Sequence, residues 1–331
     1  MGWSKAAMLG VIGLIAAPTV LVAALMFPMP KADGPSYDFH DESCPKLRQM
    51  VHDSVEEALK EDVGIAAGLL RIMFHDCFPQ GCDASLLVHG RYWSETSWPQ
   101  NKGIRQTAMA LIETIRAKVQ SPGACGPTVS CTDIMNLATR EAVMHFNVPG
   151  YAVPLGLKDS LAPADLARIW ELPGPDLSAA ELLQRFATRG FDVADVVVLS
   201  GAHTIGRSSC GGFQDRFQES TGFARRLRAN CSSDANRLQD LDVTTPDRFD
   251  NEYYHNLLAG KGVLTSDLQL LRNHTTRWWV NNFAQDQGWF FAQFGTSMSK
   301  MAHLPSEAAQ HGEIRNFSCF WSNQRWLTAS A

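Results

Sequence analysis

Two histidines, each inside a short cluster of polar and apolar residues, are the side chains best suited to chemistry in this sequence. His75 lies in the cluster Arg71 to Phe78, and His203 lies in the cluster Leu199 to Gly206. Imidazole titrates near neutral pH, so a histidine can act as a general base or as a metal ligand. Two such rings could act on one flat cofactor from opposite sides, one as a ligand and the other as a base.

The first cluster has the periodicity of a helix. Arg71 and His75 are four residues apart and share a helix face, with Phe74 beside them. A permanently charged guanidinium beside an imidazole suits acid–base chemistry on a small polar substrate. Small residues lie one and two turns back, and we expect them to let a planar ligand approach closely: Gly64, Ala67 and Gly68. The alternative is a helix end whose polar side chains are merely solvated.

The residues after His75 form a short oxygen-rich loop. Asp76, Asp83 and Ser85 surround a turn at Gly81, with two cysteines close by. Hard oxygen ligands in a short loop are typical of calcium sites. The alternatives are a polar loop tied by a disulfide with no ion, or a thiol or zinc enzyme that uses His75, Asp76 and Cys77. Zinc sites need clustered Cys and His, and only Cys77 and Cys82 lie close together in the sequence.

Composition and charge narrow the class of protein. The chain has 331 residues, of which 45% are hydrophobic and 19% charged, and its formal net charge is −5. This is an ordinary globular composition, and the mild acidity argues against non-specific nucleic-acid binding. Residues 6–29 are apolar and uncharged, which indicates a cleaved signal peptide or a signal anchor over 1–32, followed by one domain over 33–331.

All eight cysteines follow the apolar N-terminal segment. An even number behind a secretory signal predicts four disulfides in an oxidising compartment, and the sequence alone leaves 105 pairings open. Three sequons, at Asn230, Asn273 and Asn316, fit a secreted glycoprotein.

Most periodic stretches are typical of helices. We expect helices over 47–60, 63–76, 104–119, 132–146, 251–258 and 289–301. Ser178 and Glu181 form a capping-box pattern before an apolar run, and Gly190 is a plausible stop. Residues 193–202 contain four consecutive apolar residues that would also suit a buried strand. Few stretches alternate with period two, so the chain is predicted to be mainly all-α.

These motifs together resemble those of plant secretory (class III) haem peroxidases. The stretch from Arg71 to Ser85 resembles the distal haem motif and calcium loop of that family, and Leu199 to Gly206 resembles its proximal haem motif. The resemblance extends from about Tyr37 to Cys319. It implies two helical halves that sandwich one haem b, stapled by disulfides, and it favours a helix over 193–202.

The resemblance also assigns roles around the haem. His75 would be the distal base, Arg71 would stabilise the charge that develops as the O–O bond of hydrogen peroxide breaks, and Asn101 would orient His75. His203 would bind the haem iron, and Asp267 would accept its other N–H. Glu95 and Asn101 keep the spacing of the family's Glu–Asn pair, and Phe74 would contact the haem.

Two calcium ions are implied. The distal ion would take the side chains of Asp76, Asp83 and Ser85 and the carbonyls of Pro79 and Gly81. The proximal ion would bind at a second set of oxygens: Thr204, Asp242, Thr245 and Asp250, with the Arg248 carbonyl. The second loop is oxygen-rich enough to suit a hard cation on composition alone.

The family's disulfide pattern implies the pairs Cys44–Cys125, Cys77–Cys82, Cys131–Cys319 and Cys210–Cys231. Pro173 resembles the proline at the mouth of the haem channel, where aromatic donors dock. The chain departs from the family at Leu157–Lys158, where two arginines are common, in residues 96–103, and in a segment between Arg315 and Cys319 that is one residue longer than usual. None of these departures removes a haem-pocket residue.

The expected activity is peroxide-dependent one-electron oxidation of phenolic donors through a ferryl haem, in wall polymerisation, defence or peroxide removal. We expect a monomer that is secreted to the extracellular space or cell wall, with membrane anchoring through 1–32 or a vacuolar location as alternatives. A non-catalytic binding module that keeps the peroxidase fold is the competing class of function, and correctly folded protein without haem would favour it.

Overall fold

The computed structural model describes residues 34–91 and 93–324. The chain divides into two units, Met1–Asp33 and Gly34–Ala331, so the predicted signal or anchor over 1–32 lies outside the described residues. Within the described ranges, no helix has both the length and the apolar character needed to cross a bilayer.

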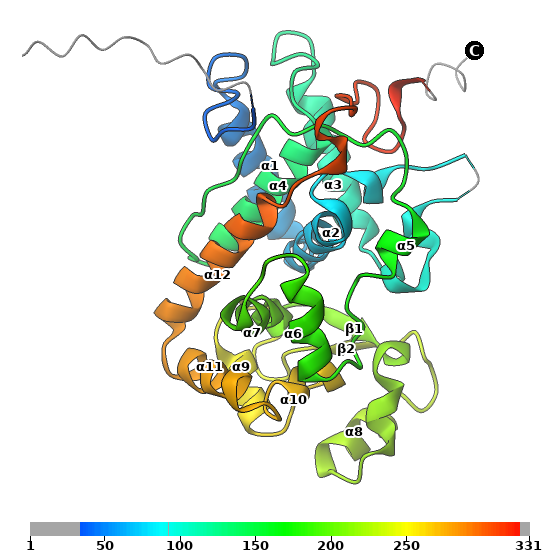
Figure 1. The fold of residues 1–331 in the computed structure, drawn as a ribbon, viewed down its shortest axis with the longest axis vertical. Coiled ribbons are helices and arrows are strands. Elements are labelled where there is room, and N and C mark those ends of the chain that lie inside the picture. Colours follow the sequence, from blue (N-terminus) through cyan, green and yellow to red (C-terminus); the bar gives the residue numbers. More distant parts are fainter. Residues whose placement is uncertain (1–33, 92, 325–331) are drawn as a thin grey trace, which may run out of the picture. The chain divides into compact units, whose positions relative to one another are not determined.

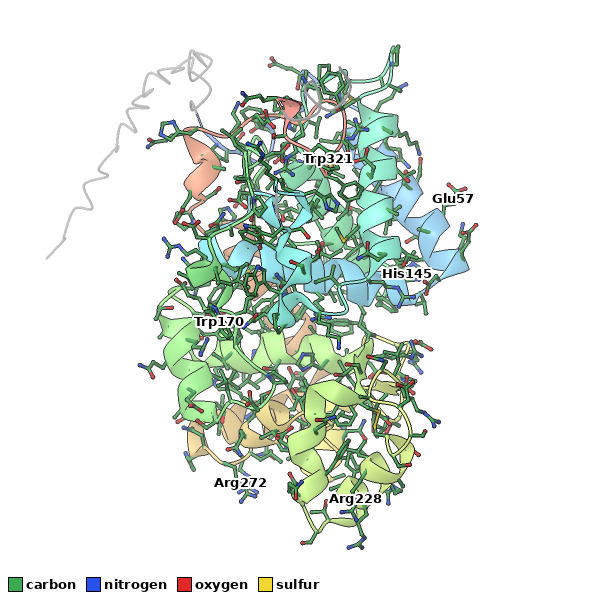
Figure 2. The ribbon with its side chains drawn as sticks, turned by 90° about the vertical axis from the view of Figure 1, so that its right-hand side faces the viewer. Glu57, His145, Trp170, Arg228, Arg272 and Trp321 are labelled. Atoms are coloured by element: carbon green, nitrogen blue, oxygen red, sulfur yellow. A yellow bond between two sulfur atoms is a disulfide. The ribbon has the colours of Figure 1, made fainter. Side chains whose placement is uncertain are left out.

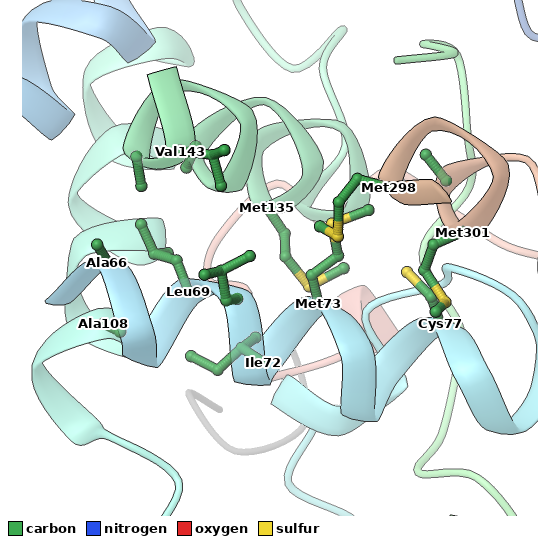
Figure 3. Packing of buried hydrophobic residues seen from close by; sticks show 14 of the residues in the cluster. Ala66, Leu69, Ile72, Met73, Cys77, Ala108, Met135, Val143, Met298 and Met301 are labelled. Atoms are coloured by element: carbon green, nitrogen blue, oxygen red, sulfur yellow. The ribbon is translucent and has the colours of Figure 1, made fainter. Parts of the chain in front are cut away.

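Four helices form the first group of the second unit: α1 (Leu47–Glu61), α2 (Gly64–Gln80), α3 (Gln106–Val119) and α4 (Cys131–Met144). Helix α2 contacts the other three. It is apolar on most of its circumference because it lies in the middle of the group. Figure 3 shows its buried side chains, among them Leu69 and Met73, in the core between the helices.

The second group contains five helices: α6 (Ala179–Ala187), α7 (Val193–Ser200), α9 (Glu252–Leu258), α10 (Thr265–Gln269) and α11 (His274–Gln285). Ser178 and Asp192 begin α6 and α7 with complete capping boxes, so the predicted capping box at Ser178 is confirmed. Helix α12 (Gln287–Ala302) packs against α7 of this group and α2 of the first, and Figure 1 shows it running beside both.

Shorter elements complete the unit. They are helices α5 (Leu166–Ile169) and α8 (Gly222–Asn230), the strands β1 (Arg207–Ser209) and β2 (Leu238–Asp240), and 3₁₀ segments at Ser85–Leu87, Glu95–Ser97, Pro99–Asn101, Gly201–Thr204, Cys210–Gln218 and Glu307–Ala309. The two strands pair antiparallel, with Ser208 opposite Gln239. The mainly helical prediction is therefore confirmed.

Four disulfides cross-link the unit: Cys44–Cys125, Cys77–Cys82, Cys131–Cys319 and Cys210–Cys231. They are the pairs that the resemblance implies. The longer segment before Cys319 is accommodated, because the guanidinium of Arg315 is buried and donates to the Cys319 carbonyl (2.8 Å).

Three sequence-based expectations need adjustment. Helix α2 runs four residues beyond 76, to Gln80, because the bond from Gly81 N–H to the Cys77 carbonyl keeps its last turn closed. The helix expected over 193–202 is confirmed up to Ser200, and the strand alternative is excluded, but the segment ends in a 3₁₀ turn rather than in α-helix. Helix α11 was not expected, although Asn273 caps it by accepting hydrogen bonds from two backbone N–H groups.

The expectation that Gly64 and Gly68 admit a planar ligand is wrong. A Cβ at Gly68 would lie 2.8 Å from Cβ of Ala108, and one at Gly64 would lie about 3.0 Å from the Arg105 guanidinium. Both glycines therefore allow α2 to approach α3 and the residue before it closely.

Candidate active site

The distal cluster is built on α2 and the 3₁₀ turn at Pro99–Asn101. His75 Nδ1 lies 2.7 Å from Oδ1 of Asn101. The Asn101 amide donates in turn to the Glu95 carbonyl (3.0 Å), which fixes its oxygen toward the imidazole. Asn101 is therefore the acceptor, so Nδ1 of His75 carries the proton and Nε2 is left as a base.

Arg71 lies one turn before His75 on the same face of α2, as the spacing predicts. Its Nε donates to His75 Nε2 (3.3 Å), and its Nη2 donates to the Lys102 carbonyl (3.0 Å). Burial, followed by the positive charge of Arg71, lowers the pKa of His75 from 6.5 to about 3, although the hydrogen bond to Asn101 acts in the opposite direction. The imidazole is therefore neutral at ordinary pH and can accept a proton.

The proximal cluster is built on the 3₁₀ turn after α7. His203 Nδ1 donates to Oδ1 of Asp267 (2.9 Å), and the Tyr253 hydroxyl donates to the same oxygen (2.8 Å). Burial acts to lower the pKa of His203, but the charge and the hydrogen bond of Asp267 outweigh it and raise the pKa. Two histidines in one molecule thus have pKa values shifted in opposite directions.

The two clusters lie close to each other. The positive charge of Arg71 acts on His203, and a Cβ at Gly206 would lie 2.8 Å from Cβ of Ala67, so the proximal turn closely approaches α2. The imidazole of His203 keeps 36% of its surface accessible, and its Nε2 has no hydrogen-bond partner within the described ranges. Half-buried apolar side chains lie on the same elements as the two imidazoles: Ala67 and Phe74 on α2, Leu199 on α7 and Ala202 in the turn that carries His203.

This donor set fits a haem. A neutral imidazole nitrogen that is held by a bond on its other side is a typical iron ligand, and apolar flanking groups suit a porphyrin. The Phe74 ring meets the His75 ring edge-on and stacks on Phe186 of α6, which holds it against the core.

The loop after His75 gathers three buried carboxyl groups. Asp76 accepts from the backbone N–H groups of Asp83 (3.0 Å) and Ala84 (2.9 Å). Burial raises the pKa of Asp83 to about 6 and that of Glu95 to about 7, and burial together with these two neighbours raises the pKa of Asp76. Ser85 Oγ is buried beside them and makes no hydrogen bond of ordinary geometry. A divalent cation would keep such carboxyl groups ionised, so the chemistry of this loop fits calcium.

A second group of oxygens surrounds Thr204. Its hydroxyl lies within hydrogen-bond range of Asp242 (3.3 Å), the Arg248 carbonyl (3.5 Å) and Asp250 (3.5 Å). The Thr245 hydroxyl also reaches Asp250 (3.0 Å). One hydroxyl proton can serve only one of three acceptors, so this convergence of oxygens also fits a hard cation.

The predicted calcium ligands include only two Asp side chains at each site, and the rest are hydroxyl and carbonyl oxygens. In the part of the chain that the structure describes, no group of three or more His, Cys, Asp or Glu side chains could hold a metal ion. Pro173 is half-buried in the segment between α5 and α6.

Several contacts at the site were not predicted from the sequence, and two of the residues that make them, Tyr253 and Arg315, had been assigned no role there. Tyr253 bonds to Asp267, and the fully buried Arg315 donates to the carbonyls of Ala84 (2.9 Å) and Ser160 (2.6 Å). The Glu95 side chain accepts from Ala164 N–H (2.6 Å) beside the calcium loop. Their contacts are between residues far apart in the sequence, so no local pattern could reveal them.

Comparison with known proteins gives a consistent result. The family model described as Peroxidase matches residues 51–286. Peroxidase 12 of Arabidopsis thaliana is 40% identical over 309 residues, which cover 90% of this chain and 86% of the relative. Cationic peroxidase SPC4 of Sorghum bicolor is 41% identical over 297 residues (86% and 82%), and Peroxidase 22.3 of Oryza sativa subsp. japonica is 38% identical over 309 residues (91% and 95%).

Proposed function

The chain belongs to the peroxidase family, within the class III plant peroxidases, and we propose that His75 and His203 work on opposite faces of one bound haem. The protein is an oxidoreductase that uses hydrogen peroxide to oxidise donor substrates. We propose that the donors are phenolic and that each gives up one electron. The haem, when bound, supplies the redox chemistry; the protein side chains hold it, move protons and exclude water.

His75 is the proposed base for hydrogen peroxide. Its neutral Nε2 can take a proton from one peroxide oxygen and return it to the other as the O–O bond breaks. The bond from Nδ1 to Asn101 keeps this nitrogen unprotonated. Arg71 stabilises the negative charge that develops on the departing oxygen.

His203 is the proposed iron ligand through Nε2. Asp267 accepts its Nδ1 proton, which makes the imidazole more electron-rich and favours higher oxidation states of the iron. Tyr253 shares the same carboxylate oxygen and so limits how much negative charge Asp267 lends to the ring. Phe74 is a proposed haem contact.

We propose a distal calcium ion at Asp76, Asp83, Ser85 and the carbonyls of Pro79 and Gly81, and a proximal ion at Thr204, Asp242, Thr245, Asp250 and the carbonyl of Arg248. The distal ion would brace the helix end that carries His75, since Asp76 follows it directly. The proximal ion would brace Thr204, which follows the iron ligand.

Pro173 is the proposed docking point for phenolic donors. We further propose secretion, with 1–32 as its signal and 33–331 as the peroxidase domain. Asn230 and Asn316 are exposed and open to glycosylation, whereas Asn273 already uses its side-chain oxygen to cap α11. Membrane anchoring through 1–32 remains the alternative to cleavage.

The single observation that carries this proposal is the contrast between a histidine paired with an amide and a second histidine paired with a carboxylate. The test is an absorption spectrum of the secreted protein before and after one equivalent of hydrogen peroxide, with guaiacol oxidation measured alongside. We expect a Soret band that peroxide shifts, and guaiacol oxidation that His75→Ala abolishes. The exposed His255 on α9 serves as the matched control, because His255→Ala should leave both readouts unchanged. Correctly folded protein that takes up no haem would contradict the proposal.

A further inference from the structure

An unbroken row of aromatic rings leads away from the proximal histidine. The Tyr253 ring contacts His203 (6.2 Å between ring centroids) and Tyr254 (5.0 Å). The Tyr254 ring contacts Phe283 of α11 (5.5 Å), and the Phe283 ring contacts Trp279 (5.4 Å). All these separations are those of rings in van der Waals contact.

The row ends in three tryptophans. Trp278 contacts Trp279 (4.8 Å) and Trp289 (6.0 Å), and Trp289 also contacts Phe283 (5.7 Å). Trp278 is 49% exposed, so the outer end of the row reaches the molecular surface. Helices α9 and α11, which carry most of these residues, pack side by side (Figure 1).

The chemistry of the rings differs along the row. Tyr253 donates a hydrogen bond to the Asp267 carboxylate, an acceptor that favours oxidation of this ring over its neighbours. Tyr254 donates to the Val197 carbonyl, a group that cannot take a proton, and Phe283 has no hydroxyl. Tyr254 and Phe283 are therefore bridging rings, and the oxidisable groups lie at the two ends, at Tyr253 and at the tryptophans.

We propose that Trp278 is a second oxidation site, at which phenolic groups on macromolecules too large to reach the haem give electrons to the enzyme through this aromatic row. The inference rests on the proposed function, because the oxidising equivalents come from peroxide reduction there. Trp278 suits such donors because half of its side chain is exposed on helix α11, where a bulky phenolic chain can reach it.

The electrons and protons of this route balance. Each hydrogen peroxide takes two electrons and two protons to form two waters. Each donor phenol loses one electron to oxidised Trp278 and its hydroxyl proton to water, which leaves a phenoxyl radical. The electron passes inward along the row of rings to the haem site. Two such transfers restore the resting enzyme.

The first test locates the radical. The haem-loaded full chain is treated with peroxide and a nitroso spin trap without a donor, and adducts are mapped by peptide mass spectrometry. We expect adducts at Trp278 in the native sequence, and a decrease of about tenfold in Phe283→Leu, in which Trp278 is still present but the only ring contact between the tryptophans and Tyr254 within the described ranges is lost. An unchanged adduct yield in a Phe283→Leu variant with a normal Soret band would overturn the proposal.

The second test compares a large and a small donor in a variant that changes only an exposed side chain. In Trp278→Phe, oxidation of guaiacyl groups attached to dextran should fall about tenfold, while oxidation of free guaiacol should change less than about twofold. Trp170→Phe is the matched control, because Trp170 is 56% exposed, is labelled at the surface in Figure 2, and contacts no other ring in the described part of the chain. Trp170→Phe should leave the oxidation rate of the dextran-bound donor unchanged.

The outcomes separate this inference from the proposed function. Absence of a Soret band and of guaiacol oxidation would contradict the haem peroxidase itself. A normal Soret band and normal guaiacol oxidation, with equal rates on dextran-bound guaiacyl groups in the native protein and Trp278→Phe, would overturn only the second site. Spin-trap adducts at Trp278, combined with unchanged oxidation of dextran-bound guaiacyl groups by Trp278→Phe, would likewise overturn it. The aromatic row would then carry a radical to the surface without oxidising a donor there.

Discussion

His75 and His203 both use Nδ1 to bind one partner, but the partner of His75 is a neutral amide and that of His203 is a carboxylate. Burial, followed by the charge of Arg71, lowers the pKa of the first imidazole to about 3, whereas Asp267 outweighs burial and raises the pKa of the second. One residue type thus becomes a proton acceptor on one side and an electron-rich ligand on the other. The comparison teaches that the surroundings of each imidazole, rather than the histidine itself, set its role: burial and Arg71 keep His75 neutral, and the carboxylate of Asp267 makes His203 electron-rich.

Removal of the distal base should have the largest effect. His75→Ala is expected to lower the rate of reaction with hydrogen peroxide by about 10³- to 10⁴-fold, because no neighbouring group can take the peroxide proton. Stopped-flow absorbance at the Soret band measures this rate. A loss of less than tenfold, with haem still bound, would show that another group is the base and would break the comparison.

Neutralising the proximal carboxylate should have the next largest effect. Asp267→Asn keeps the shape of the side chain but replaces the charged acceptor of the His203 proton, so the proximal pairing comes to resemble the distal one. Activity is expected to fall about 10- to 100-fold, and the haem reduction potential should rise. Steady-state kinetics and a redox titration provide the two readouts; an unaltered potential would count against the role of Asp267.

Replacing the amide partner of His75 by a carboxylate tests the comparison through the pH dependence of the rate of reaction with peroxide. In the native protein the pKa of His75 lies below its ordinary value of 6.5, so its neutral form is retained as pH falls and is lost only near pH 3. The peroxide rate should therefore stay level to about pH 4. Asn101→Asp places a carboxylate at Nδ1, which should raise this midpoint and lower the rate at acid pH about tenfold. Identical pH profiles in the native protein and Asn101→Asp would contradict the assignment of His75 as the base.

The same pKa has a consequence for folding stability. A depressed histidine pKa in the folded state contributes stability that is fully present above about pH 6.5 and is lost as pH falls toward about 3. Urea unfolding of the native protein and of His75→Ala across this range would reveal the contribution as a difference in pH slope.

Removal of calcium should have the smallest effect on the chemistry itself. If each ion is present at about a hundred times its Kd, chelation should lower the free energy of unfolding by about 3 kcal/mol for each site. Asp83→Asn and Asp242→Asn separate the sites: the first should mainly change the peroxide rate, and the second should mainly change the haem spectrum. Thermal unfolding that does not respond to a chelator would count against both ions.

Helices were predicted best where neighbouring residues form a clear local pattern. Pairs of functional groups were predicted best where both members belong to a long family motif. The capping box at Ser178 and the helical stripes of α1 and α3 come from neighbouring residues, and they appear where expected. The close approaches of Asn101 to His75 and of Asp267 to His203 were expected only from the family resemblance, since no periodicity links residues so far apart. Helix α11 was missed because its capping Asn273 also forms a sequon and its tryptophans are not spaced as a simple stripe.

Other features depend on packing that a sequence does not display. The glycines of α2 were assigned to a ligand face, but their neighbours are Arg105 and Ala108. The contact of Tyr253 with Asp267 and the burial of Arg315 against the calcium loop bring together residues from separate helices and turns. Only the folded chain reveals that the proximal carboxylate has two donors rather than one.

The most direct measurement of the central contrast is the iron–histidine stretching band in the resonance Raman spectrum of the reduced, haem-loaded protein. We predict that this band shifts to lower frequency in Asp267→Asn, because His203 loses electron density, and stays in place in Asn101→Asp, because His75 does not bind the iron. A band that moves in Asn101→Asp and not in Asp267→Asn would contradict the account.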